Sequence, residues 1–87
     1  MSYTISFGPG VEREMARLPR PMLVRIDRAI AALAQNPRPV GCKKLAGSAL
    51  LYRVRVGDWR VVYEINDANQ LVIVLIVRHR REVYRGL

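Results

Sequence analysis

The sequence contains a single cysteine, Cys42, and a single histidine, His79, so it can form no disulfide within the chain. It also offers no cluster of cysteines for a structural metal. The longest wholly apolar run, Leu71–Val77, is far shorter than the ~20 residues that span a bilayer. The start of the chain has neither the charged region nor the apolar region of a signal peptide. These absences predict a cytoplasmic protein with no membrane segment.

Acidic side chains are also scarce. The chain has 7 Asp and Glu against 15 Lys and Arg, which gives a formal net charge of +8. Lys43 and Lys44 are the only lysines, so arginine supplies nearly all of the positive charge. This balance favours a polyanionic partner: a nucleic acid, an acidic protein or an anionic membrane surface. Because arginine binds phosphate with two parallel hydrogen bonds, the bias favours phosphate recognition.

Two alternating segments, Leu51–Val56 and Trp59–Ile65, flank Gly57-Asp58 and predict a tight β-hairpin. Glycine in the first loop position suits a type II′ turn, since glycine adopts positive φ without strain. A two-residue loop also sets the register and places Arg55 opposite Arg60. The full set of expected pairs is Val56 with Trp59, Arg55 with Arg60, Val54 with Val61 and Arg53 with Val62.

Alternation assigns the hairpin side chains to two faces. The face expected in the core carries Tyr52, Val54, Val56, Trp59, Val61, Tyr63 and Ile65. The other face carries Arg53, Arg55, Arg60, Val62 and Glu64. Like charges directly opposite each other destabilise a sheet by roughly 0.2–1 kcal/mol, so the pair of Arg55 and Arg60 opposes folding unless an anion lies between them. The alternative is a solvated face with splayed arginines.

The remaining periodicity predicts two further strands and two helices around the hairpin. The expected strands are Tyr3–Phe7 and Leu71–Val77, and the expected helices are Val11–Leu18 and Met22–Gln35, with a loop over Arg38–Leu50. At 87 residues, 51% of them apolar, the chain has room for one domain, residues 1–87, with one two-layer core. The expected fold is α+β, with the N-terminal strand and a helical hairpin packed on a mainly antiparallel sheet of about four strands.

Basic and aromatic residues follow directly on the last strand and are therefore held at one end of the sheet, near the hairpin arginines. They are Arg78, His79, Arg80, Arg81, Tyr84 and Arg85. Positive charge for phosphates and a ring that stacks on a splayed base are what single-stranded RNA binding requires. The alternative for such a segment is a frayed, solvated terminus.

Three segments in this order, KLAG, YRVRVGDWRVVYEI and HRREVYR, resemble the RelE toxins of type II toxin–antitoxin systems, within the wider RelE/ParE superfamily. The resemblance covers nearly the whole chain. It implies a ribosome-dependent mRNA endoribonuclease that cuts the codon in the A site by attack of the RNA's own 2′-OH on the adjacent phosphate, with no metal or cofactor. The implied partners are the ribosome, mRNA and a cognate RelB-like antitoxin, whose acidic segment wraps the toxin in a hetero-oligomer.

The resemblance also implies roles for individual residues. Arg53 and Arg55 match the family's basic pair on the first hairpin strand, and Arg60 matches its phosphate-binding arginine. Arg80 matches the arginine near the leaving group, and Tyr84 the aromatic residue that stacks on the target base. His79 is a further catalytic candidate. The remaining candidates for RNA binding are Arg78, Arg81, Arg85, Lys43 and Lys44, with a solvated surface as the alternative for the two lysines.

The sequence leaves the identity of the general base open. Some family members have lysines at the positions of Arg53 and Arg55, and an arginine with a pKa above ~12 is a poor base. An ordinary histidine side chain titrates at ~6.5, which suits proton transfer and makes His79 a candidate, although a hydrogen-bonded histidine that shapes the strand end is equally consistent. Glu64 is another candidate. Catalysis by arginine electrostatics alone is a fourth possibility.

Two other functions are compatible with the sequence. One is a ParE-type inhibitor of DNA gyrase on the same fold, and the other is an RNA-binding module without catalysis. For an antitoxin partner, we expect the apolar sheet positions Val62, Val72, Val74 and Ile76 to offer a surface to cover.

Overall fold

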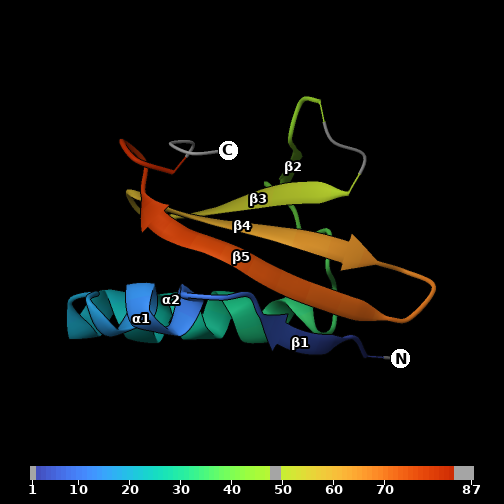
Figure 1. The fold of residues 1–87 in the computed structure, drawn as a ribbon, viewed down its shortest axis with the longest axis horizontal. Helices are drawn as coiled ribbons and strands as arrows, with labels where there is room; N and C mark the ends of the chain where they lie inside the picture. The colour runs from blue at the N-terminus through green and yellow to red at the C-terminus, as the bar shows by residue number, and fades with distance from the viewer. Residues whose placement is uncertain (1, 48–49, 84–87) are drawn as a thin grey trace.

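In the computed structural model, which describes residues 2–47 and 50–83, a five-stranded sheet carries two helices on one face (Figure 1). The strands lie in the order β1-β5-β4-β3-β2. In chain order the elements are β1 (Thr4–Phe7), α1 (Val11–Ala16), α2 (Arg20–Leu33), β2 (Lys43–Lys44), β3 (Leu51–Val56), β4 (Trp59–Asn66) and β5 (Leu71–His79). The α+β class and the helical hairpin on one face of the sheet are confirmed.

The hairpin of β3 and β4 has the predicted register. Arg55 pairs with Arg60, and Val56 pairs with Trp59 across the turn. Gly57 has a φ of 60°, whereas Asp58 does not have a positive φ, as expected for a type II′ turn. The two-residue loop therefore fixes which side chains of the hairpin face the helices.

The sheet has one strand more than expected. The segment Arg38–Leu50, predicted as a loop, contains the two-residue strand β2, which pairs Lys43 with Arg53. A two-residue strand shows no alternation in the sequence, and only its pairing with β3 identifies it. At the other edge, β1 pairs in parallel with β5 from Thr4 to Phe7, and the other strand pairs are antiparallel.

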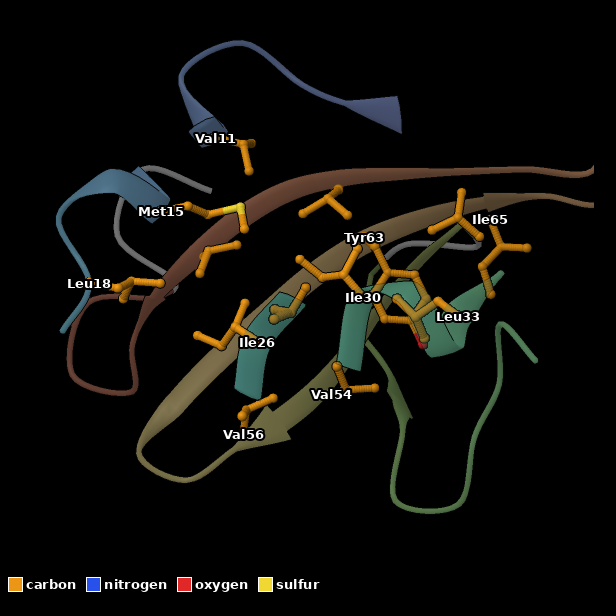
Figure 2. Close-up of a cluster of buried hydrophobic side chains, with 14 residues drawn as sticks. Val11, Met15, Leu18, Ile26, Ile30, Leu33, Val54, Val56, Tyr63 and Ile65 are labelled. Carbon is orange, nitrogen blue, oxygen red and sulfur yellow. The ribbon is translucent and has the colours of Figure 1, made fainter. Parts of the chain in front are cut away.

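The helices cover the predicted apolar face of the hairpin. In Figure 2 the labelled side chains of α1 and α2 converge on those of β3 and β4. Leu18 lies beyond the end of α1 but is only 7% exposed, and Pro21 lies in the first turn of α2, where its missing N–H costs nothing. The buried members of this core are Val11, Met15, Leu18, Ile26, Ile30, Leu33, Val54, Val56, Val61, Tyr63, Ile65, Val72, Val74 and Val77.

A β-bulge in β5 redirects the end of the sheet. The register changes from Tyr63 opposite Val74 to Val62 opposite Ile76, which leaves Leu75 as the extra residue on β5. Beyond the bulge the alternation is inverted, so that Ile76 shares a face with Val62, and Val77 joins the core under the helices.

The structure corrects the expectation of an open apolar surface at four sheet positions. Val72 and Val74 are fully buried in the core under the helices. Val62 and Ile76 lie on the other face, where Val83 covers them in a second apolar cluster with Leu45 and Leu75. Within the described residues, these four positions are buried by the chain itself and offer no surface to a partner.

The segment after β5 folds back over the face opposite the helices (Figure 1). The N–H of Glu82 donates to the carbonyl of His79 at 2.8 Å, which closes a turn, and Val83 is 1% exposed. This part of the chain is therefore anchored, in contrast to the frayed terminus that the sequence also allowed.

A polar network joins four segments near the start of β5. Arg38 donates to both carboxylate oxygens of Asp67, at 3.2 and 2.9 Å, and its Nε donates to the hydroxyl of Tyr52. The hydroxyl of Tyr3 donates to Asp67 at 2.6 Å. The hydrogen bond from Arg38 lowers the pKa of Asp67 to about 2. The network ties the N-terminal segment and the loop after α2 to the β4–β5 turn.

The described helices include none with the length and apolar character needed to cross a membrane.

Candidate nucleic-acid interface

Three arginines lie in direct register across adjacent strands. Arg55 on β3 pairs with Arg60 on β4, and Arg60 pairs with Arg78 on β5. Directly paired residues share one face of a sheet, and here it is the face that the helices leave uncovered. Each adjacent like-charged pair opposes folding by roughly 0.2–1 kcal/mol. We call Arg55, Arg60 and Arg78 the arginine row.

Two further cations flank the arginine row. Arg53 lies two residues before Arg55 on β3, and Lys43 pairs with Arg53 from β2. Lys44 pairs with Tyr52, which packs against the core under the helices. Lys44 therefore lies on the helix-covered face, opposite to the arginine row. Glu64 shares the face of the arginine row and is partly buried between Leu51 and Ile73. The structure thus brings Lys43 to the site and leaves Lys44 outside it.

Arg60 is held by its own hairpin. It is 8% exposed, and its Nη1 donates to the carbonyls of Gly57 at 3.1 Å and Trp59 at 2.9 Å. These two hydrogen bonds fix the orientation of the Arg60 guanidinium at the centre of the row.

Arg78 is turned toward α1. Its Nε donates to Oε2 of Glu14, and Oε1 of the same carboxylate accepts the backbone N–H of Val77 at 3.4 Å. The Arg78 side chain remains 36% exposed. A hollow of about 330 Å³ lies beside it, lined by Glu14, Arg17, Trp59, Val77, Arg78, His79 and Glu82. The guanidinium of Arg78 is thus fixed by α1 at the edge of the sheet.

The segment after β5 brings Arg80 to the hairpin turn. The backbone N–H of Arg80 donates to the carbonyl of Asp58 at 2.8 Å, and its side chain is exposed. Arg81 is also exposed, and its N–H donates to Nδ1 of His79 at 3.3 Å. The hairpin turn and the arginines after β5 therefore lie together, as the sequence predicted.

His79 lies apart from the arginine row. It pairs with Trp59 in the register, and the two rings meet edge to face at 5.6 Å with an interplanar angle of 82°. Trp59 packs against the core under the helices, so His79 points to the opposite face from Arg60. This placement favours the second reading of His79, a hydrogen-bonded histidine that shapes the end of the strand.

Tyr84 and Arg85, expected to stack on a base and to bind RNA, lie outside the described residues.

Two residues near the site carry no signal in the sequence. Arg25 of α2 lies beside the hairpin turn, since a Cβ on Gly57 would be 3.4 Å from its Nη1. Glu14 of α1 holds Arg78. Both lie off the apolar stripes of their helices, where periodicity predicts only exposure to solvent. Among the described residues, no three His, Cys, Asp or Glu side chains are grouped so that they could hold a metal ion.

Comparisons with known proteins identify relatives across nearly the full chain. A family model described as the ParE toxin of the type II toxin–antitoxin system parDE matches residues 5–84. Toxin RelG of Mycobacterium tuberculosis is 33% identical over 98% of this chain and 99% of RelG. In the RelE–RelB complex from the archaeon Pyrococcus horikoshii, one chain matches at 28% identity with a TM-score of 0.82, over 92% of this chain and 97% of that one. The toxin–antitoxin complex RelBE2 of M. tuberculosis gives 28% identity and a TM-score of 0.80, over 92% and 100%.

The described fold, a five-stranded mixed sheet with two helices on one face, is that of a RelE-like domain. The chain belongs to the RelE/ParE family of toxins of type II toxin–antitoxin systems.

Proposed function

We propose that the protein is a ribosome-dependent endoribonuclease that cuts mRNA in the ribosomal A site. The observation that carries this proposal is the arginine row, in which Arg55 and Arg60 are paired on the face free of helices and Arg78 extends the row to the β5 edge. Such an arrangement opposes folding on its own, and a bound phosphate would offset the repulsion. The ribosome and mRNA are the proposed partners, and the cytoplasm is the proposed location because translation takes place there.

The proposed reaction is attack of the 2′-OH on the adjacent phosphate, which releases the 5′ oxygen and leaves a 2′,3′-cyclic phosphate. Arg55 and Arg60 would bind the phosphate oxygens and stabilise the charge that builds up on them. Arg53 would help to orient the 2′-OH, and Arg80, which is exposed beside the hairpin turn, would stabilise the leaving oxygen. Tyr84 is proposed to stack on the target base.

The proton of the 2′-OH needs an acceptor. Glu64 is a carboxylate on the face of the arginine row, two residues along β4 from Val62, which pairs with Arg53, whereas His79 faces the other side of the sheet. Among the described residues we therefore favour either Glu64 as the base or electrostatic catalysis, in which the arginines lower the pKa of the bound 2′-OH and water takes the proton.

A cognate antitoxin is the proposed protein partner. The relatives from P. horikoshii and M. tuberculosis were solved as toxin–antitoxin complexes. This chain has a formal net charge of +8, which an acidic antitoxin segment would complement in a hetero-oligomer. Such a segment, lying across the arginine row, would compete with RNA for the same cations.

The test is primer extension on an mRNA translated in vitro, with and without ribosomes. We expect cuts within A-site codons only when ribosomes are present. Arg55→Gln and Arg80→Gln, which change exposed side chains, should each lower cleavage at least tenfold, in the range that a lost charge-stabilising group costs. Arg28→Gln, an exposed arginine on α2, is the matched control and should cut normally. An intact message with the unmodified protein would contradict the proposal.

A second candidate function is inhibition of DNA gyrase. It is favoured by the family match, whose description names the ParE toxin. A supercoiling assay with purified gyrase discriminates the two, since a gyrase inhibitor blocks supercoiling and leaves a translated message intact. Under this alternative, Arg55→Gln would have no effect on mRNA in any assay.

A further inference from the structure

Three successive backbone N–H groups after β5 donate hydrogen bonds that close a turn. The N–H of Arg80 donates to the carbonyl of Asp58 at 2.8 Å, and that of Glu82 donates to the carbonyl of His79 at 2.8 Å. Between them, the N–H of Arg81 donates to Nδ1 of His79 at 3.3 Å. The first two acceptors are backbone carbonyls, which every residue supplies. Nδ1 of His79 is therefore the acceptor of this set that depends on the identity of a side chain.

The contact between His79 and Arg81 joins residues two positions apart. Asn and Asp side chains close turns in the same way, because their oxygen accepts the N–H of the residue two places on. A ring nitrogen of histidine accepts a hydrogen bond only when it carries no proton. The contact therefore requires the neutral imidazole with its hydrogen on Nε2.

The ring of His79 is held in place by Trp59. The two rings meet edge to face at 5.6 Å with an interplanar angle of 82°. Trp59 pairs with His79 in the register and packs against the core under the helices. This contact restricts the rotamers of the histidine, so Nδ1 meets the amide of Arg81 at little further cost in side-chain entropy.

The turn that His79 closes carries Arg80. The side chain of Arg80 is exposed, and its backbone lies against the hairpin turn of β3 and β4. A long side chain on a loose backbone loses more entropy when it binds a charged group than one on a fixed backbone. Charge stabilisation in a transition state depends on groups that are already in place. The acceptor on His79 thus bears directly on how well Arg80 can act.

We propose that His79 is a positioning residue of the RNA-cleaving site, whose neutral imidazole holds the turn that presents Arg80 to the leaving oxygen. The inference rests on the proposed ribonuclease activity and gives His79 a role in cleavage that involves no proton transfer. Its effect on cleavage passes through Arg80. Asparagine, which is not a base, should therefore be able to replace it.

The test is single-turnover cleavage on ribosomes that present one A-site codon, with two variants that separate the acceptor from the ring. His79→Asn keeps an acceptor for the N–H two residues on and loses the ring, and it should cleave within about twofold of the normal rate. His79→Phe keeps a ring against Trp59 and loses the acceptor. It should cleave about fivefold more slowly, a factor in the range of one net hydrogen bond.

The other roles of His79 predict different orders of the two variants. A general base would be lost in both, so H79N would cleave as poorly as H79F. A histidine needed only to pack against Trp59 would be replaced better by phenylalanine than by asparagine. Either result would overturn the inference.

The path through Arg80 is tested by a double-mutant cycle with Arg80→Gln. If His79 acts through Arg80, the double variant H79F/R80Q cleaves at the rate of R80Q, because the second change removes nothing further. Multiplied losses in the double variant would contradict this path.

Two measurements on the protein alone separate this inference from the proposed activity. At about pH 8, where an ordinary histidine is neutral, proton–nitrogen correlation spectra should show hydrogen on Nε2 of His79 and none on Nδ1. Exchange of the Arg81 amide hydrogen should become faster in H79F and stay slow in H79N. Hydrogen on Nδ1, or unchanged exchange in H79F, would overturn the inference even if the protein cuts mRNA. If both measurements agree but no message is cut, the proposed activity fails and the role of His79 in cleavage fails with it.

Discussion

At the scale of single residues, the molecule uses two carboxylates to hold two arginines near opposite ends of β5. Glu14 holds Arg78 near the end of the strand, and Asp67 holds Arg38 close to its start. In the second pair both side chains are exposed to solvent. This pair is important because it joins distant segments, since Asp67 also accepts a hydrogen bond from the hydroxyl of Tyr3. Single residues thus connect elements that are far apart in the sequence.

Asp67→Asn should make stability less dependent on pH in the acid range. The hydrogen bond from Arg38 lowers the pKa of Asp67 from its ordinary 3.8 to about 2 in the folded state. A lowered folded pKa contributes stability that is fully present above the unfolded value and is lost as the pH falls toward 2. Urea midpoints at pH 7, 4 and 2 should show a small deficit of the variant at pH 7 that disappears at pH 2. Asp27→Asn, on α2, is the control, and a deficit that persists at pH 2 would contradict the assignment.

Gly57→Ala should destabilise the hairpin more than Gly47→Ala. Both glycines have positive φ, at 60° and 81°, so alanine costs about 1–2 kcal/mol at either position. At Gly57 the new Cβ would also lie 3.3 Å from Cε of Met22 and 3.4 Å from Nη1 of Arg25, whereas nothing lies within 4 Å at Gly47. Urea unfolding of the two variants measures the difference. Equal losses would show that the neighbours at the hairpin turn yield freely.

At the scale of elements, the β-bulge at Leu75 determines which β5 side chains lie on the face opposite the helices. It brings Ile76 beside Val62, and Val83 closes over both. The segment after β5 is thereby anchored with its arginines near the hairpin turn. The position of Arg80 in the candidate site depends on this small apolar cluster.

Val83→Ala should loosen that segment. Val83 is 1% exposed, and removing two buried carbons costs about 1.5–2.5 kcal/mol, from the transfer free energy and the cavity left behind. Hydrogen exchange at the amide of Glu82, which donates to the carbonyl of His79, should become faster as the turn opens. Val24→Ala, at an exposed position on α2, is the matched control and should cost little. Unchanged exchange at Glu82 would show that other contacts hold the turn.

The hairpin, the helical stripes and the core face could be read from the sequence because each depends on local periodicity. The bulge could not, since Leu71–Val77 is apolar in both alternations and an inverted register leaves the pattern unchanged. β2 is too short to show a period. The contacts of Glu14 with Arg78 and of Arg38 with Asp67 join residues 64 and 29 positions apart, and a single sequence carries no signal for such distant pairs.

At the scale of the whole molecule, the positive charge is divided between two layers. The sheet face carries the arginine row, whereas the helices carry exposed arginines that include Arg25 and Arg28. A formal net charge of +8 attracts any polyanion, so binding to RNA by itself does not identify a site. The two layers are distinguished by how each affects the salt dependence of binding.

The salt dependence of binding to a short single-stranded RNA should therefore be set by the cations of the sheet face. Each phosphate contact on a single strand contributes about −0.7 to the slope of log K against log salt concentration. Arg55→Gln and Lys43→Gln should each reduce the steepness by about that amount, because both side chains are exposed beside the row. Arg28→Gln should leave the slope unchanged. The measurement is fluorescence anisotropy of a labelled RNA over a series of salt concentrations. If Arg28→Gln reduces the slope as much as Arg55→Gln does, the RNA is bound by the charge of the whole molecule, and the arginine row has no special role in binding.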